Sequence, residues 1–192
     1  MATIPTGYAN ILIPHKHSGS ARSAAITFGV KNEGAFATPS AVADAVWNAW
    51  EPEVTVAVDS AVTIGPPIAT VNYGGTPVTG SGTASVNGGT GLDSIPGNGA
   101  LLVQKLSILG GRANRGRFFM PWCLQEANVD ELGGIAGGTV SDYQDIFDNV
   151  LAALTTEDVP MVVLHTGAGT PATVSQLVVQ STIGTQRRRI RS

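Results

Sequence analysis

Alternation of apolar and polar residues predicts most of the strands in this chain. Residues 10–14 (NILIP) and 23–30 (SAAITFGV) are expected to be strands separated by the polar segment HKHSGSAR. In EVTVAVDSAVTI, residues 53–64, valines alternate with Thr, Ala and Asp, which is typical of a half-buried antiparallel strand. The most apolar run, ALLVQKLSIL (residues 100–109), is expected to be a core strand.

The last part of the chain is expected to form a β-hairpin. Its strands are MVVLH (residues 161–165) and TVSQLVVQSTIGT (residues 173–185), joined through a GAGTP turn. In the second strand Leu177, Val179 and Ile183 share one face. Because this alternation runs directly into the terminal arginines, we expect TQRRRIRS to continue the strand, rather than to form a disordered terminus or a nucleic-acid arm.

A first helix is predicted over residues 38–52, TPSAVADAVWNAWEP. Thr38 can cap it, Pro39 suits the first helical position, and Glu51 before Pro52 predicts its end. Apolar residues recur at spacings of three and four and predict one buried stripe, in which the tryptophans are expected to be core or interface anchors. The stripe consists of Val42, Val46, Ala49 and Trp50, and Trp47 lies beside it.

A second helix is predicted within residues 138–160. Its apolar face comprises Tyr143, Ile146, Phe147, Val150, Leu151 and Leu154, and Ser141 with Gln144 forms a capping box. Asp142, Asp145 and Asp148 fall on the other side. Aspartates on a helix can bind a metal or act as acids, but a solvated or partner-facing stripe needs neither role.

Residues 65–99 are rich in Gly, Thr, Ser and Asn. We expect short surface strands and long loops there, or alternatively an arm that becomes ordered on a neighbouring molecule. Taken with the other elements, the pattern predicts a mainly β (α+β) fold. We expect an antiparallel β-sandwich or jelly-roll-like sheets with two amphipathic helices, in a single structural domain spanning residues 1–192. No signal peptide and no membrane span are expected from the sequence.

Charge is scarce and segregated. Charged residues make up 13% of the 192 residues and the net charge is −3. Basic residues concentrate within 105–117 (Lys105, Arg112, Arg115 and Arg117) and at the C-terminal end (Arg187, Arg188, Arg189 and Arg191). Without these eight, three basic residues remain against 14 acidic ones, a balance of −11. Residues 126–158 contain eight acidic residues and no Lys or Arg. Such segregation is typical of complementary protein surfaces and disfavours a general nucleic-acid binder, which would be basic overall.

The first basic cluster is interleaved with aromatic residues. Phe118, Phe119 and Trp122 follow Arg117 closely. Arginine with aromatics is also the pattern of a nucleic-acid contact, so nucleic acid remains an alternative partner for both clusters.

Catalytic chemistry has little support in the sequence. Cys123 is the only cysteine and is expected to be half-buried, and a catalytic thiol would need a nearby histidine. His15 and His17 have strand spacing for a metal but no evident third ligand, so we expect solvated loop histidines. His165 is expected to be a structural donor. We therefore predict no enzymatic activity, no catalytic or metal-binding residues and no cofactor.

The C-terminal half resembles a loosely described group of proteins from environmental viral and phage genomes. The resemblance rests on GRANRGRF (residues 111–118) and TQRRR (residues 185–189) and covers roughly residues 100–192. Its members are presumed virion structural components without catalytic residues. The chain departs from the group at Pro121–Trp122, where proline followed by a small residue is expected.

The resemblance implies a virion structural protein that assembles in many copies, most simply a capsid or coat protein, with a tail or decoration component as the other possibility. Its expected partners are other copies of itself, other virion proteins and packaged nucleic acid, without a membrane. Its expected location is the virion, and the host cytoplasm during assembly. A nucleic-acid-binding protein using the two arginine clusters is the alternative function.

Overall fold

The computed structural model describes residues 3–17, 23–55, 62–87, 101–110, 114–125, 140–164 and 170–180. These residues form two antiparallel sheets and two helices. The fold is therefore α+β and mostly antiparallel β, as the alternation of apolar residues predicted.

The larger sheet has eight strands and is organised around the long strand β1. Its order is β10-β9-β2-β1-β3-β6, with β4 paired to β1 and β5 paired to β4. The strands are β1 (Tyr8–His17), β2 (Ser23–Lys31), β3 (Val62–Ile64), β4 (Ile68–Val71), β5 (Val78–Ser81), β6 (Val86–Asn87), β9 (Met161–Val163) and β10 (Ala172–Thr173). Because β2 pairs along the other side of β1 from Tyr8 to Lys16, β3 and β4, which pair with different halves of β1, both lie along its remaining side.

The smaller sheet has the order β11-β7-β8. It consists of β7 (Leu101–Gly110), β8 (Asn114–Gln125) and β11 (Gln176–Gln180). The β7–β8 hairpin has a register irregularity between Leu102 and Gln104. Strand β7 confirms the strand predicted over residues 100–109, and the burial of its side chains lies outside what the structure describes.

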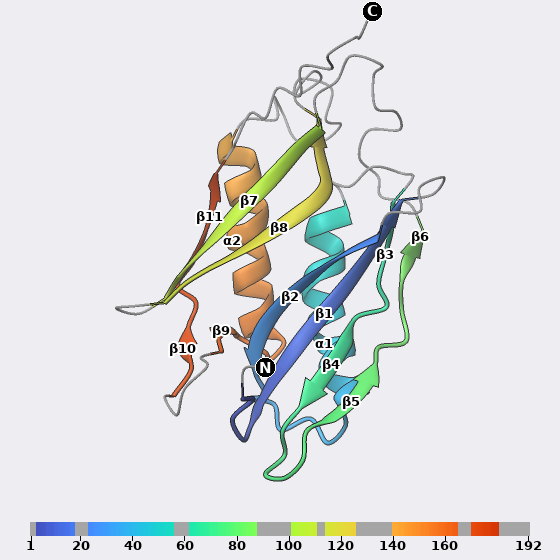
Figure 1. Cartoon of the computed structure of the whole chain (residues 1–192), viewed down its shortest axis with the longest axis vertical. Helices are drawn as coiled ribbons and strands as arrows, with labels where there is room; N and C mark the ends of the chain where they lie inside the picture. Colours follow the sequence, from blue (N-terminus) through green and yellow to red (C-terminus); the bar gives the residue numbers. More distant parts are fainter. Residues whose placement is uncertain are drawn as a thin grey trace, which may run out of the picture.

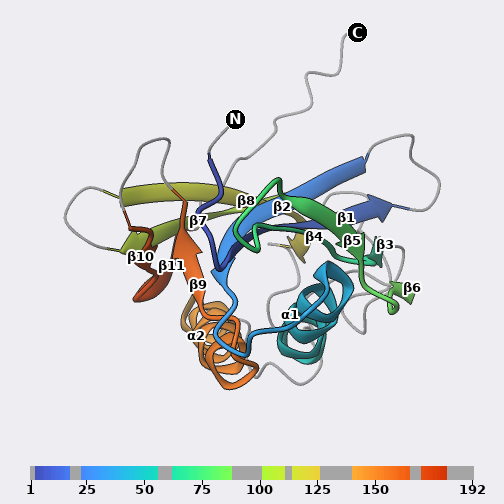
Figure 2. The ribbon, with the colours of Figure 1, turned by 90° about the horizontal axis from the view of Figure 1, so that it is seen from below.

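Both helices lie on the same side of the strands (Figure 2). Helix α1 (Pro39–Val54) and helix α2 (Val140–Thr156) lie side by side in this layer. The strands form the second layer, and no described helix covers their other face. The sandwich or jelly roll expected from the sequence is not confirmed, because the sheet is open and helices cover its apolar face.

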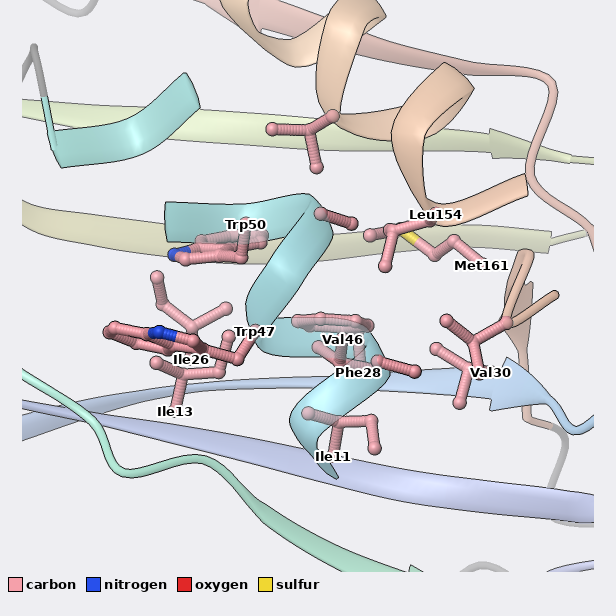
Figure 3. Close-up of a cluster of buried hydrophobic side chains, with 14 of the residues drawn as sticks. Ile11, Ile13, Ile26, Phe28, Val30, Val46, Trp47, Trp50, Leu154 and Met161 are labelled. Carbon is pink, nitrogen blue, oxygen red and sulfur yellow. The ribbon is translucent and has the colours of Figure 1, made fainter. Parts of the chain in front are cut away.

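The core fills the space between the helices and the larger sheet (Figure 3). Odd-numbered residues of β1 face it, including Ile11 and Ile13, and even-numbered residues of β2 do the same, including Ile26 and Phe28. Helix α1 contributes Val42, Val46 and both tryptophans, and helix α2 contributes Ile146, Phe147, Val150 and Leu154, all of them buried. The apolar stripes predicted for both helices are confirmed at these positions, with Leu151 partly buried at the margin, and the side chain of Tyr143 lies outside what the structure describes.

Helix α1 begins as predicted but ends later. Thr38 is the N-cap, and its Oγ1 accepts a hydrogen bond from Ala41 N at 3.2 Å. The predicted stop at Glu51 is wrong, since Pro52 lies inside the helix. Val54 is fully buried, and both the backbone N–H and the hydroxyl of Thr55 donate to the Glu51 carbonyl. Burial of Val54 and the hydrogen bonds of Thr55 therefore stabilise the helical conformation beyond Pro52.

The strand expected over residues 53–64 is wrong at its start and confirmed at its end. Residues 53–54 belong to α1, residues 56–61 lie outside the described residues, and only Val62–Ile64 form a strand. The alternating valines at 54, 56 and 58 predicted a strand because period two is a local signal. Val54 is helical instead, because its side chain is buried in the core in that conformation.

The expected C-terminal hairpin is also corrected. Strands β9 and β10 pair as a hairpin, but β11 leaves that sheet and pairs with β7. Leu177 of β11 is fully buried. Ile183 and the strand continuation through residues 181–192 lie outside the described residues. A long-range partner, β7, therefore replaces the local partner that sequence proximity favoured.

The Gly-rich segment forms short strands on the chain's own sheet. β4, β5 and β6 lie within residues 65–87, which confirms short strands there, although β4 places Ala69 and Val71 in the core. Residues 88–99 lie outside the described residues. In α2, the expected N-cap Ser141 is instead a helical residue, because the helix begins at Val140.

Candidate functional site

The β7–β8 hairpin carries most of the first basic and aromatic cluster. Arg115, Arg117, Phe118, Phe119 and Trp122 are all positions of β8. The register sets Phe119 opposite Lys105 of β7 and Arg117 opposite Ser107. The structure therefore places both predicted residue types on one hairpin at the edge of the smaller sheet. Arg112 lies outside the described residues.

The acidic residues predicted on the second helix lie on α2. Asp142 is in its first turn, and Asp145 and Asp148 are exposed. Carboxylates near the start of a helix are stabilised by the partial positive charge of its unpaired N–H groups. This placement confirms the division of α2 into a buried apolar face and an exposed acidic side.

Helix α1 extends the acidic surface. Asp44, Glu51 and Glu53 belong to α1, and neither helix contains a lysine or arginine. Asn149 Nδ2 of α2 donates to Glu53 Oε2 at 3.2 Å, so the two helices are joined at their exposed surface. We call the exposed surface of α1 and α2 the acidic helix face.

The opposite face of the larger sheet has a different character. Residues of β1, β2, β4 and β5 that alternate with the core residues form it, and no charge occurs among them between Lys16 at one end and Lys31 at the other. They are Asn10, Leu12, Pro14, Ala25, Thr27, Ile68, Thr70, Thr79 and Ser81. We call this surface the uncharged sheet face.

Side chains of neighbouring strands pair across the uncharged sheet face. Leu12 lies opposite Thr27 on one side and Ile68 on the other. The hydroxyls of Thr70 and Thr79 are hydrogen-bonded at 2.9 Å. This face was missed in the sequence, although its signal was present: the polar positions of the alternating strands hold Thr, Ser and Asn instead of charged residues.

Strand β11 leads towards the acidic helix face. It runs beside α2 (Figure 1), and Leu177 packs in the same core as the buried residues of that helix. The strand runs from the β9–β10 end of α2 towards the first turn of the helix, which holds Asp142. The second arginine cluster, Arg187, Arg188, Arg189 and Arg191, lies outside the described residues.

His15 is not the solvated loop residue expected from the sequence. It belongs to β1, its side chain is fully buried, and its Nδ1 lies 3.1 Å from the Ile13 carbonyl oxygen. Burial lowers the pKa of His15 to about 4, against the weaker opposing effect of that hydrogen bond. The residue is therefore neutral at physiological pH. The sequence misplaced it because His15 begins the polar run HKHSGSAR, which suggested a loop, whereas strand alternation continues through it.

Two buried polar atoms have no hydrogen-bond partner among the described residues. They are His15 Nε2 and Trp50 Nε1. Within the same residues, no group of three His, Cys, Asp or Glu side chains is arranged to hold a metal ion. Neither α1 nor α2, the helices in the described part of the chain, is long and apolar enough to cross a membrane.

Comparison with known proteins places no relative beside this chain. No protein-family model, no curated protein and no solved structure matches it.

Proposed function

We propose that this protein is a structural subunit of a virus particle that self-assembles in many copies. A capsid or coat role is the first choice and a tail or decoration role the second. It acts in the virion and reaches it through the host cytoplasm. The observation that carries the proposal is the separation of the surface into an acidic helix face and an uncharged sheet face.

Separation of this kind suits a molecule whose surface is largely interface. A sheet face without charge can pack against protein without desolvating ions, and that desolvation is the main cost of burying charged groups. The acidic helix face, in contrast, needs a basic partner if it is buried. The arginine clusters of the same sequence supply that complement, so copies of one chain are sufficient to satisfy both surfaces.

Arginine is well suited to this contact. Its planar guanidinium binds a carboxylate through two parallel hydrogen bonds and keeps its charge when buried. We therefore assign the arginines at 187–191 to the aspartates of α2, in the same or a neighbouring subunit. The direction of β11 along α2 supports this assignment.

Nucleic-acid binding through the arginine clusters is the alternative. The acidic helix face disfavours it, because the exposed carboxylates of α2 and the half-buried ones of α1 repel a phosphate backbone. The β7–β8 hairpin favours it, because it brings Lys105, Arg115 and Arg117 onto adjacent strands. A nucleic-acid contact would therefore be confined to that hairpin and the terminal cluster.

The test is assembly of the purified protein. Light scattering at micromolar concentration and moderate salt is expected to give a mass far above 19.7 kDa, and negative-stain electron microscopy is expected to show shells, rings or tubes. A monomer under every assembly condition would contradict the proposal. Nucleic-acid affinity measured over a salt series separates the alternative: a monomer whose binding weakens steeply with salt would favour a nucleic-acid-binding protein.

A further inference from the structure

Strand β5 forms a free edge of the larger sheet. It is paired only with β4 among the described strands, and its outer side is open in the ribbon (Figure 1). Thr79 and Ser81 are exposed, and Val78 is 47% exposed. The other exposed large hydrophobic residue in the described part of the chain, Tyr73, lies in the connection between β4 and β5.

The hydrogen bonds around β5 define which backbone groups face outward. Gly82 N donates to the Pro67 carbonyl at 2.8 Å, so Gly82 points its backbone groups towards β4. Neighbouring residues of an antiparallel strand point their N–H and C=O groups to opposite sides. Gly80 and Val78 therefore also face β4, whereas the N–H and C=O groups of Thr79 and Ser81 face away from it.

The outward segment is closed at both ends. Thr83 N also faces away from β4, and Asp44 Oδ1 accepts its hydrogen bond at 2.8 Å. Pro77 has no N–H to offer. The outward N–H donors of this edge are thus those of Thr79 and Ser81, one residue before and one residue after Gly80, and each of these residues also presents its C=O group outward.

We propose that this edge pairs antiparallel with β5 of a second copy about a twofold axis at Gly80. Thr79 exchanges both backbone hydrogen bonds with Ser81 of the second copy, and Ser81 does the same with Thr79 of the second copy. The proposal rests on the proposed function, since it names one contact through which the subunit assembles. It joins two eight-stranded sheets into one, with both acidic helix faces on the same side.

A second copy is the occupant that fits this edge. The outward groups of Thr79 and Ser81 are related by a twofold axis at Gly80, so a second β5 satisfies all four of them in one contact. The two strands come closest at Gly80, where there is no side chain to collide. Between Val78 and Ser81 the edge lacks the lysine, proline or bulge with which proteins usually prevent such pairing, and these four residues carry no charge to repel their copy.

Disulfide trapping tests the register. In a Cys123→Ser background, subunits carrying Thr79→Cys are mixed with subunits carrying Ser81→Cys. The paired Cα atoms would lie about 5.5 Å apart, within the range of a disulfide. We expect a cross-linked dimer in the mixture and little from either variant alone, because identical positions are two residues out of register.

A proline variant tests the hydrogen bonds. Thr79→Pro removes an outward N–H and leaves the β4–β5 ladder intact, since proline is tolerated on an edge strand. Thr79→Ala is the matched control, because both variants lose the hydroxyl that bonds Thr70 but only proline loses the N–H. We expect Thr79→Pro to weaken dimer formation by about tenfold or more relative to Thr79→Ala, with unchanged circular dichroism.

The outcomes separate this proposal from the proposed function. The edge pairing is overturned if the wild type forms particles, Thr79→Pro assembles normally and the mixed cysteine variants form no cross-link. The proposed virion role would be unaffected by that result. A mixed cross-link without any larger assembly supports the edge pairing and contradicts the virion role. If the wild type stays monomeric and the mixed cysteine variants form no cross-link, both proposals are overturned.

Discussion

The ring of Phe28 stacks on the indole of Trp50, with ring centroids 5.5 Å apart and an interplanar angle of 20° (Figure 3). Phe28 comes from β2 and Trp50 from α1, so this stack joins the larger sheet to the first helix. Trp50 is fully buried and Phe28 is 4% exposed. The contact therefore lies within the buried interface between the helix layer and the larger sheet. The acidic helix face and the uncharged sheet face lie on the two outer sides of these layers.

Removal of this indole is expected to destabilise the fold strongly. Trp50→Ala leaves a cavity in the core and should lower the free energy of unfolding by about 3–5 kcal/mol. Trp50→Phe keeps a ring for Phe28 and removes the unpartnered N–H, so its cost should be less than half as large. Urea unfolding monitored by circular dichroism measures both. Tyr73→Ala, at an exposed aromatic, is the control and should change little.

The elements of the core were largely predictable because their signals are local. Thr38 and Pro39 mark the start of α1, and the spacing of Val42, Val46 and Trp50 marks its buried side. The end of α1 was not predictable, because burial of Val54 depends on a sheet assembled from distant segments. The partner of β11 was missed for the same reason, since its pairing with β7 spans a long stretch of sequence.

His15 makes the fold sensitive to acid. Its pKa is about 4 in the folded protein and 6.5 in an exposed reference, so the unfolded chain binds a proton first as the pH falls. Its contribution to stability is complete above pH 6.5 and is lost between pH 6.5 and 4. Between pH 7 and 5 this amounts to about 2 kcal/mol.

A His15→Leu variant should lose this part of the pH dependence. Urea unfolding at pH 7, 6 and 5 is compared for the wild type and the variant. We expect the free energy of unfolding of the wild type to fall more steeply, by about 2 kcal/mol over that interval. Parallel pH dependence of the two proteins would mean that His15 is not buried and neutral.

Gly65 should be the least replaceable of three compared glycines. It has a φ of +81°, and an added Cβ would lie 2.8 Å from Trp47 Cζ3. Gly7 has a similar φ of +80° but no atom within 4 Å of such a Cβ, and Gly75 has neither restriction. The three positions therefore separate backbone strain from steric collision.

Alanine at each position gives the comparison. Gly65→Ala should cost about 2–4 kcal/mol, because strain and collision with a buried tryptophan add. Gly7→Ala should cost about 1 kcal/mol from strain alone, and Gly75→Ala should be neutral or slightly stabilising. Thermal unfolding ranks them. Equal effects at Gly65 and Gly7 would show that Trp47 moves aside without cost.

The candidate site was predictable in its composition but not in its arrangement. The sequence separates acidic from basic segments, and the structure places Asp145 and Asp148 on the exposed side of α2 as expected. The sequence alone could not reveal that α1 adds Asp44, Glu51 and Glu53 to the same layer, because the packing of two helices on one face of a sheet is a tertiary property. The uncharged sheet face likewise emerges only when four strands are placed side by side.

The terminal arginines are expected to be required for assembly. Truncation after Gln186 removes Arg187, Arg188, Arg189 and Arg191 and would leave the carboxylates of α2 without their proposed partners. Loss of one member of a buried ion pair costs about 2–5 kcal/mol, and a symmetric particle repeats that cost in every subunit. We therefore expect a folded subunit that does not form particles, measured by circular dichroism and electron microscopy.

Replacement of the same four arginines by lysine sharpens this prediction. Lysine keeps the charge but lacks the planar fork, so paired arginines predict weak assembly for this variant as well. Asp145→Asn with Asp148→Asn should give a matching defect if these carboxylates are the partners. Particles that form normally after truncation but lack nucleic acid would show that the arginines bind the genome instead. Normal particles with normal contents would show that the terminal segment has neither role, and only a folded, non-assembling subunit supports the interface.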